Sequence, residues 1–301
     1  MEGIRRNVLL KNYSGYKIGG PADFFCEPKS RKDIISALNF ASIKKVPIFV
    51  LGGGFNVLIS DDGFRGLVIK PTFNSITFKG REIIAGAGVN LDKLIKTTLN
   101  RGFVGLEDFS GIPGTVGGAL FINIHYYKML IGNFVKWVEC INFQGETRII
   151  NFDDKDWKYE FSKIQKDKLT VFRACFKLKN VGFREKWKAI GKSEEIIRTR
   201  HYKYPQEPSA GSVFQNLDKE KFYGAPSISA AYYIDSLGMK GKRIGGAEIS
   251  GRHANIIINR GGATAKNVIK LASMIKKRVK RKFGIEFKPE VQFVGFKSSP
   301  F

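Results

Sequence analysis

Apolar residues recur at helical spacing in several segments of the chain. Residues 31–44 and a later segment between Thr264 and Gly284 each place their apolar positions on one helical face. Thr264 is typical of a helix N-cap, and Gly284 is typical of a C-terminal stop. Asn90 begins another amphipathic segment, and residues 232–237 have a shorter helical pattern. These patterns predict four helices.

Short apolar or alternating runs bounded by glycine or proline predict the strands. They cover residues 23–28, 46–51, 64–69, 83–87, 137–143, 147–152, 169–178, 254–259 and 285–293. A charged stretch with few apolar residues, 180–192, predicts a boundary or a linking helix. Helices and strands are mixed without an internal repeat, so we expect an α+β fold with domains at residues 1–75, 76–182 and 183–301.

The composition limits the possible partners. The 301 residues, 43% of them hydrophobic, are enough for packed cores in two or three domains. The formal net charge of +24 favours anionic partners such as nucleic acid, anionic lipid or phosphorylated small molecules, and a lysine-biased surface explains it equally well. The charges are spread along the chain without a zinc spacing, an RNA-binding strand motif or a basic tail. We therefore expect no nucleic-acid partner and no metal site.

The cysteines and the apolar runs indicate the compartment. Cys26, Cys140 and Cys175 have no regular spacing, so we expect buried thiols on strands and no disulfide framework. No apolar window approaches the length of a membrane span, and no signal-peptide pattern is visible. The sequence predicts a cytoplasmic protein with no membrane partner.

Two glycine-rich segments give the first indication of chemistry. Residues 52–56 follow an apolar strand and contain three glycines, and residues 111–118 contain four. Backbone N–H groups in such loops can approach a phosphate closely. The first segment matches neither Gly-x-Gly-x-x-Gly nor a Gly-Lys-Ser/Thr loop, so a tight turn is the alternative. Two backbone-only loops fit a dinucleotide better than a mononucleotide.

Two runs are more specific than these glycines alone: Ser-Gly-Ile-Pro-Gly-Thr-Val-Gly-Gly from Ser110, and Gly-Ser-Val-Phe-Gln-Asn from Gly211. They occur in order with other short motifs, at residues 18–23, 51–61, 244–247, 252–255 and 289–291. In this order the chain resembles the UDP-N-acetylenolpyruvoylglucosamine reductase family, from about residue 18 to residue 295. Its length is similar to the family's shorter form.

The resemblance implies a fold and a reaction. The fold is an N-terminal FAD-binding domain of the PCMH/VAO type, with two α+β subdomains, followed by a C-terminal α+β substrate-binding domain. Hydride from NADPH reaches the enolpyruvyl ether of a UDP-linked amino sugar by way of non-covalent FAD. The product is UDP-N-acetylmuramate, a peptidoglycan precursor. We expect an NADPH-dependent UDP-N-acetylmuramate dehydrogenase that is monomeric.

The family's cofactor segments imply a set of FAD contacts along the N-terminal part of the chain. These are Gly52, Gly53, Gly54, Asn56, Val57, Ser110, Gly111, Pro113, Gly114, Thr115, Gly118 and Asn123. Substrate contacts are expected at Arg200, Asn216, Lys240 and Asn255. An arginine suits a diphosphate because its guanidinium pairs with phosphate oxygens in a bidentate way, although a solvated basic loop is the alternative.

Three positions correspond to the family's catalytic residues, and two of them match. Ser212 matches the proton donor, for which a capping turn serine is the alternative. Glu290 matches the glutamate that stabilises the substrate carboxylate as negative charge develops, and a strand-edge carboxylate is the alternative. Glu160 lies at the third position, where the family has arginine, although Tyr159 and Ser162 beside it match the family pattern.

The substitution at residue 160 has a physical consequence. A carboxylate facing an anionic substrate is repulsive, so the positive charge must come from elsewhere or the activity must differ. Four cations are candidates for the missing charge: Lys158, Lys163, Arg198 and Arg200.

Residues 123–127 also depart from the family pattern, because bulky residues replace three small ones. We expect a reshaped wall near the cofactor. His125 has the pKa range of an acid or base, but packing beside two tyrosines is the commoner role for such a histidine.

Two other functions fit the same residues. One is a flavin oxidoreductase with a different acceptor, and the other is a flavin- or nucleotide-binding protein with little turnover. NADPH oxidation that depends on the enolpyruvyl substrate separates the reductase from both.

Overall fold

The computed structural model describes residues 3–127, 129–153, 155–218, 221–222 and 225–301. Contacts within the chain form two compact units. Unit 1 comprises the chain up to Arg6, Phe24–Gly53 and Gly66–Arg200, and unit 2 comprises Asn7–Asp23, Gly54–Arg65 and His201–Phe301. The three domain ranges expected from the sequence stay a prediction.

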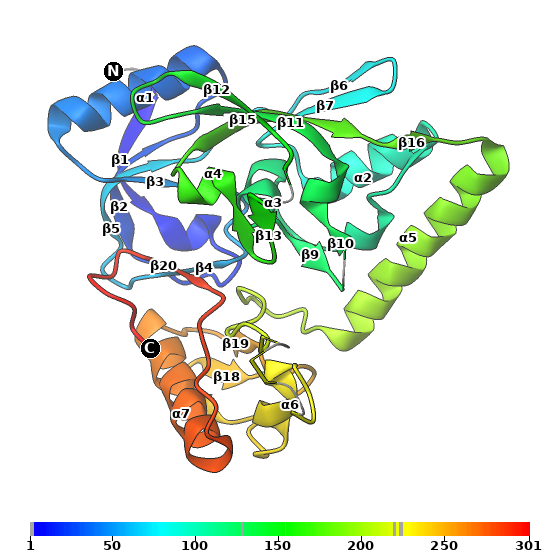
Figure 1. Ribbon diagram of the computed structural model, residues 1–301. Helices are drawn as coiled ribbons and strands as arrows, with labels where there is room; N and C mark the ends of the chain where they lie inside the picture. Colours follow the sequence, from blue (N-terminus) through cyan, green and yellow to red (C-terminus); the bar gives the residue numbers. More distant parts are fainter. Residues whose placement is uncertain (1–2, 128, 154, 219–220, 223–224) are drawn as a thin grey trace. The chain divides into compact units, whose positions relative to one another are not determined.

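Unit 1 contains a five-stranded antiparallel sheet in the order β12-β11-β15-β7-β6 (Figure 1). Its strands are β6 (Ile76–Lys79), β7 (Glu82–Gly86), β11 (Val135–Ile141), β12 (Thr147–Asn151) and β15 (Thr170–Lys177). The short helix α3 (Val116–Phe121) packs against β7 and β15. Because α3 begins within the second glycine segment, this packing fixes that segment on the sheet.

A second sheet has the order β1-β2-β5-β3. Its strands are β1 (Ile4–Leu9), β2 (Pro21–Cys26), β3 (Ile48–Val50) and β5 (Phe64–Ile69). The chain passes between the two units within β1, β2 and β5. β3 pairs with β5 in parallel, and the first glycine segment leaves the carboxyl end of β3.

The local helix signals of unit 1 are confirmed. α1 (Arg31–Lys44) has the predicted bounds, and Ser30 forms a capping box with Asp33 at its start. α2 (Leu91–Asn100) begins after Asn90, whose side chain accepts a hydrogen bond from the Lys93 N–H. The three cysteines are buried on strands, as expected.

The remaining elements near unit 1 are short except for one helix. They are β8 (Phe103–Val104), η2 (Glu107–Phe109), β9 (His125–Tyr126), β10 (Met129–Leu130), η3 (Ile131–Phe134), β13 (Trp157–Lys158), β14 (Phe161–Ser162), α4 (Lys163–Lys166), β16 (Lys179–Asn180) and α5 (Phe183–Lys203). α5 occupies the charged stretch for which a linking helix was one of the two predictions.

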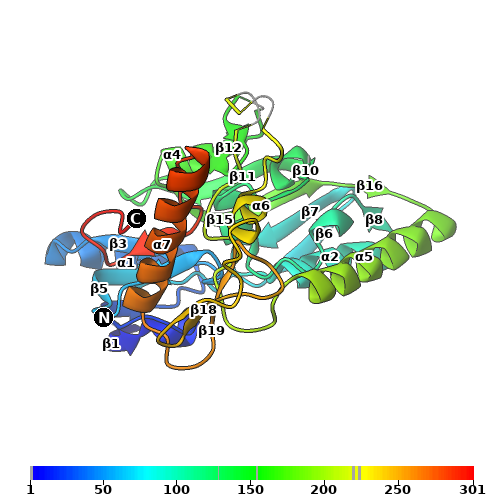
Figure 2. The same cartoon turned by 90° about the horizontal axis from the view of Figure 1, so that it is seen from below.

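Unit 2 combines an antiparallel sheet, β17-β18-β19, with a parallel pair of strands, β4 and β20. Its elements are η1 (Leu10–Tyr13), β4 (Val57–Ile59), α6 (Ala230–Asp235), β17 (Arg243–Ile244), β18 (Ala247–Ile249), β19 (Ile257–Asn259), α7 (Ala265–Phe283) and β20 (Gln292–Val294). α7 packs along β17 and β18 (Figure 2). Its predicted apolar face is buried at Val268, Leu271, Ile275 and Val279.

Both ends of α7 agree with the prediction. Thr264 accepts a hydrogen bond from the Asn267 N–H, and Gly284 ends the helix with a φ of 70°. Asp61 adds a feature that the sequence did not reveal, because its carboxylate accepts hydrogen bonds from the N–H groups of Ala265 and Lys266, at 2.7 and 3.1 Å. A negative charge there also stabilises the helix dipole.

The strand predicted at residues 285–293 was too long. Only β20 (Gln292–Val294) is a strand, and the preceding residues instead cross the segment that follows Ser212. Phe214 forms an isolated antiparallel bridge with Pro289. Proline has no N–H to extend a ladder, so the pairing stays a single bridge.

Three glycines of unit 2 lie where backbone segments cross. A Cβ atom added to Gly20 would collide with the Asp61 carbonyl oxygen, and one added to Gly63 would collide with the Pro21 carbonyl oxygen. A Cβ atom added to Gly295 would likewise collide with the Gly63 carbonyl oxygen. This close approach explains why the motif at residues 18–23 contains glycine at position 20.

We expect Gly20→Ala to lower the free energy of unfolding by about 1–3 kcal/mol, because the added methyl group has no room between two backbones. Gly191→Ala is the matched control. Gly191 lies in α5 with no described atom within 4 Å of an added Cβ, so alanine should raise stability by about 0.5–1 kcal/mol. Urea unfolding measures both changes. Equal free energies of unfolding for the two variants would contradict the close backbone approach at Gly20.

Candidate functional site

The two glycine segments predicted to hold a dinucleotide lie side by side in unit 1. A Cβ atom on Gly52 would lie 3.1 Å from the Thr115 Oγ1 atom and 3.3 Å from the Gly118 Cα atom. An added Cβ atom on Gly118 would lie 4.0 Å from the Gly53 nitrogen. Gly52 and Gly118 therefore place no side chain of their own where the two backbones approach, beside the Thr115 hydroxyl. Backbone N–H groups of such segments can approach an anionic ligand closely.

Hydrogen bonds to the end of β7 hold the second glycine segment in place. The N–H groups of Val116 and Gly117 donate to the carbonyl groups of Val89 and Ala87, at 2.8 and 2.9 Å. A Cβ atom on Gly117 would lie 2.9 Å from the Ala87 Cβ atom. The glycine at position 117, which was not among the predicted contacts, thus allows the segment to lie close to the sheet.

Other predicted cofactor residues also have defined positions in unit 1. Ser110 is buried and its hydroxyl lies 2.7 Å from the Ser193 hydroxyl, and the Gly111 N–H donates to the Asp92 carboxylate at 2.8 Å. Gly114 accepts a hydrogen bond from the Leu91 N–H at 3.1 Å, next to Pro113. These contacts make the segment rigid before any ligand binds, which lowers the entropy cost of binding.

Asn123 is fully buried and connects two parts of unit 1. Its Nδ2 atom donates to the Lys158 carbonyl at 2.8 Å, and its Oδ1 atom accepts from the Gly132 N–H at 3.0 Å. The residue has a left-handed backbone, with a φ of 49°. Its amide therefore shapes the wall near the glycine segments, and a direct contact with FAD stays a prediction.

The end of the first glycine segment belongs to unit 2. Gly54 has a φ of 76°, and an added Cβ atom would collide with the Tyr13 carbonyl oxygen, so only glycine suits this position. The Asn56 carbonyl accepts a hydrogen bond from Gln292, and Val57 begins β4. Direct contacts of Gly54, Asn56 and Val57 with FAD stay a prediction.

Unit 2 brings Ser212 and Glu290 together through the backbone. Ser212 forms an antiparallel bridge with Ile256, and the next residue, Val213, accepts a hydrogen bond from the Glu290 N–H at 2.9 Å. Both Ser212 and Glu290 are half-buried. Two residues that are 78 positions apart in the sequence (290 − 212) thus lie in adjacent extended segments.

Asn255 holds the segment that contains Ser212. Its Oδ1 atom accepts from the Phe214 N–H at 3.1 Å, and its Nδ2 atom donates to the Phe214 carbonyl at 2.7 Å. Asn255 is 3% exposed. The residue predicted to contact the substrate therefore positions the serine segment, and its contact with substrate stays a prediction.

The other predicted substrate residues of unit 2 are exposed. Asn216 accepts a hydrogen bond from the Ala230 N–H at the start of α6, and Lys240 forms a 2.8 Å ion pair with Asp235. The neighbouring His253 stacks on Tyr204, so it packs as expected, and its pKa is lowered by burial and by the charge of Lys240.

Glu160 lies at the tip of a tight hairpin in unit 1. β13 and β14 pair antiparallel, with Lys158 opposite Phe161, so Tyr159 and Glu160 form the turn. Glu160 has a left-handed φ of 51°, and one of its carboxylate oxygens is buried. Ser162 is buried and caps α4 while its hydroxyl donates to the Phe121 carbonyl at 2.6 Å, so it has a structural role.

His125 lies against this hairpin. Its ring centroid is 4.3 Å from that of Tyr159. Burial lowers the pKa of His125, and the charge of Arg200 lowers it further. Because both effects disfavour the imidazolium, His125 is neutral at pH 7 and is a packing residue with a polar edge.

Arg200 is the cation that the structure brings to this neighbourhood. Its guanidinium lies 4.5 Å from the centroid of the Tyr126 ring, and its Nε and Nη2 atoms are buried. By contrast, Arg198 and Lys158 are exposed, and Lys163 lies 3.4 Å from the Asp156 carboxylate. Of the four candidate cations, Arg200 therefore fits best.

Sequence reasoning missed Tyr126, Asp92 and Ser193 as parts of this site. The spacing within α5 contains a usable signal, since Ser193 and Arg200 are seven residues apart and share one helical face. Tyr126 has no such signal, because its contact with Arg200 joins residues far apart in the sequence.

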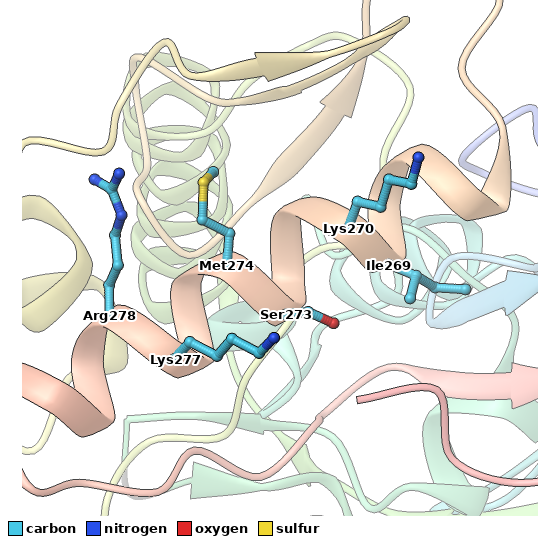
Figure 3. Close-up of a pocket in the computed structure, with 6 residues that line it drawn as sticks. All are labelled: Ile269, Lys270, Ser273, Met274, Lys277 and Arg278. Carbon is cyan, nitrogen blue, oxygen red and sulfur yellow. The ribbon is translucent and has the colours of Figure 1, made fainter.

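A hollow elsewhere in unit 2 contains none of the predicted site residues. Figure 3 shows the six side chains of α7 that line this space of about 450 Å³: Ile269, Lys270, Ser273, Met274, Lys277 and Arg278. α7 contains eight Lys and Arg residues and no Asp or Glu, so part of the excess charge is a solvated helix face. Within the described residues, no group of His, Cys, Asp and Glu side chains suits a metal ion, and no helix is long and apolar enough to cross a membrane.

Two family models match the chain. Residues 22–151 match the FAD binding domain, and residues 202–294 match the C-terminal domain of UDP-N-acetylenolpyruvoylglucosamine reductase. The first match contains both glycine segments and the Glu160 hairpin lies just beyond it. The second contains Ser212 and Glu290.

Whole-length relatives agree with these matches. UDP-N-acetylenolpyruvoylglucosamine reductase of Clostridium novyi (strain NT) is 36% identical over 299 residues, which cover 99% of this chain and 94% of that protein. The enzyme of Caldanaerobacter subterraneus subsp. tengcongensis is 36% identical over 293 residues, with 97% and 93% covered. The crystal structure of the Thermus caldophilus enzyme has a TM-score of 0.80 and 29% identity, covering 97% of this chain and 99% of that one. The chain therefore belongs to the UDP-N-acetylenolpyruvoylglucosamine reductase family.

Proposed function

We propose that this protein reduces UDP-N-acetylglucosamine enolpyruvate to UDP-N-acetylmuramate, with FAD as cofactor and NADPH as the source of hydride. The observation that carries the proposal is the pairing of the Ser212 and Glu290 segments, in which the Glu290 N–H donates to Val213 at 2.9 Å. The paired glycine segments of unit 1 supply a backbone cradle of the kind that a dinucleotide needs. Relatives of the same name along the whole chain support the assignment.

The protein residues have distinct roles in this reaction. FAD, when bound, supplies hydride to the methylene carbon of the enolpyruvyl group. Ser212 donates the proton to the adjacent carbon, and a hydroxyl is suited to this only when it is held in place by its surroundings. Glu290 stabilises the substrate carboxylate while negative charge develops on it. The bridge to Ile256 and the hydrogen bond between Glu290 and Val213 orient both side chains.

Positive charge for the substrate comes from Arg200 and Lys240 in this proposal, and Asn216 and Asn255 supply amide groups. Arg200 should attract the substrate most strongly of these residues, because it lies half-buried beside the glycine segment that begins at Ser110. A guanidinium in such a setting attracts an anion more strongly than an exposed lysine does. Its charge opposes the repulsion that Glu160 exerts on an anionic substrate.

We further propose that the protein acts as a cytoplasmic monomer without nucleic acid or membrane partners. An acceptor other than the enolpyruvyl ether, or flavin binding without turnover, is not favoured, because the catalytic serine and glutamate are both present and adjacent. NADPH oxidation by the purified, FAD-loaded protein tests the proposal directly. Oxidation that does not depend on the enolpyruvyl substrate would contradict it.

Ser212→Ala should slow the oxidative half-reaction by about 10²–10⁴-fold, because the proton donor is lost. Reduction by NADPH should stay unchanged, since no proton from Ser212 is needed in that step. Single-turnover absorbance of the flavin measures the two half-reactions separately. Ser273→Ala, on α7, is the matched control and should leave both rates unchanged. Equal reoxidation rates in the Ser212 variant and the wild type would show that Ser212 is not the proton donor.

Gly52→Val should weaken FAD binding by at least about tenfold, because its side chain would fill the space between the two glycine segments. The 450 nm absorbance of the purified protein and a titration with FAD measure the loss. Gly182→Val is the control, since no described atom lies within 4 Å of an added Cβ there. A Gly52 variant that keeps full flavin content would show that FAD binds elsewhere.

A further inference from the structure

The guanidinium of Arg200 lies over an aromatic ring at the end of α5. Its Cζ atom is 4.5 Å from the ring centroid of Tyr126, which lies in β9. The negative face of an aromatic ring attracts a cation at this distance, and the attraction is stronger where the pair is shielded from water. The Nε and Nη2 atoms of Arg200 are buried, so we expect its attraction to the Tyr126 ring to be stronger than that of an exposed pair.

The aliphatic part of Arg200 lies against the glycine segment. A Cβ atom on Gly111 would be 3.0 Å from the Arg200 Cδ atom and 3.5 Å from the Ile197 Cγ1 atom. Gly111 has a φ of 76°, and its N–H donates to Asp92 at 2.8 Å. The arginine side chain is therefore confined on two sides, by Tyr126 and by the backbone at Gly111.

A long, flexible arginine normally loses conformational entropy when it binds an anion. A guanidinium that is already confined loses less, so it binds an anion more tightly at the same charge. Glu160 makes this confinement more important, because its half-buried carboxylate lies in the turn beside His125 and Tyr159. An unconfined Arg200 could move away from the position where it opposes that charge.

We propose that Tyr126 is a positioning residue, which fixes the Arg200 guanidinium so that it binds an anionic oxygen group of the substrate. This inference rests on the proposed function. The anionic group is the enolpyruvyl carboxylate or the diphosphate, since a guanidinium attracts and hydrogen-bonds the oxygens of either. Tyr126 itself does not touch the substrate in this proposal.

The first experiment measures the dissociation constant of the enolpyruvyl substrate with FAD-loaded protein. Tyr126→Leu should raise it about tenfold, and Tyr126→Phe should stay within about twofold of wild type, because phenylalanine keeps the ring face. Arg198→Met is the control, since Arg198 is exposed on the same helix. Equal constants for the leucine variant and the wild type, or equal losses in the leucine and phenylalanine variants, would overturn the proposal.

The same titration with UDP-N-acetylglucosamine, which has no carboxylate, distinguishes the two anions. If Arg200 binds the carboxylate, Tyr126→Leu leaves the dissociation constant of this ligand unchanged. If Arg200 binds the diphosphate, both ligands lose affinity by the same factor. Both results support the proposal, whereas weaker binding of UDP-N-acetylglucosamine alone would overturn it.

The second experiment does not depend on activity. The chain has three histidines, so the NMR signal of His125 can be identified from its loss in His125→Gln. Arg200 is the charged group acting on His125, and its positive charge disfavours the imidazolium. Arg200→Met should therefore raise the pKa of His125, and Tyr126→Leu should raise it in the same direction. Arg198→Met should leave it unchanged.

The two experiments together separate this inference from the proposed function. If the pKa of His125 stays constant in Tyr126→Leu, then Tyr126 does not fix Arg200 and the inference is wrong. If that pKa rises while the substrate dissociation constant stays constant, the fixed arginine does not serve the substrate and the inference is again wrong. Absence of substrate-dependent NADPH oxidation in the wild type would instead contradict the proposed function.

Discussion

The buried amide of Asn255 determines where Ser212 lies. Its two hydrogen bonds satisfy both backbone groups of Phe214, a residue that is fully buried and belongs to no named strand. Each bond contributes only about 1 kcal/mol net, but a buried backbone group left without a partner costs about 1–3 kcal/mol. The segment therefore has one favourable register. In that register the Val213 carbonyl accepts a hydrogen bond from the Glu290 N–H, so one side chain fixes the spacing of the two proposed catalytic residues.

Glycine has a comparable role in unit 1, because two backbones approach there without side chains between them. Gly52 and Gly118 would each contact the opposite segment through a Cβ atom. The first segment leaves β3, and hydrogen bonds from Val116 and Gly117 hold the second one to Val89 and Ala87, which follow β7. The proposed dinucleotide site therefore depends on two segments that are held near the ends of strands in different sheets. Neither glycine motif alone describes it.

The sequence predicted features that depend on neighbouring residues and missed features that depend on contacts between distant segments. α7 was predicted with both of its caps because Thr264 and Gly284 each act within a few residues of a helix end, whereas α1 was predicted from its apolar spacing alone. The strand at residues 285–293 was predicted too long, because its apolar pattern comes from burial against the segment after Ser212 and not from a sheet. The family motifs identified Ser212 and Glu290, but their pairing depends on Asn255, whose contacts cross 41 residues.

The same distinction applies to the charge at residue 160. Within the hairpin, Glu160 stands where the family resemblance implies an arginine, and a sequence comparison registers only this reversal of charge. In the folded unit the end of α5 brings Arg200 over Tyr126, beside the His125 that packs on Tyr159 of the hairpin. A cation from α5 therefore lies in the neighbourhood of this hairpin, at a burial that strengthens electrostatic attraction. In the proposed function the positive charge of the site is therefore a property of tertiary structure, because Arg200 and Glu160 come from different elements.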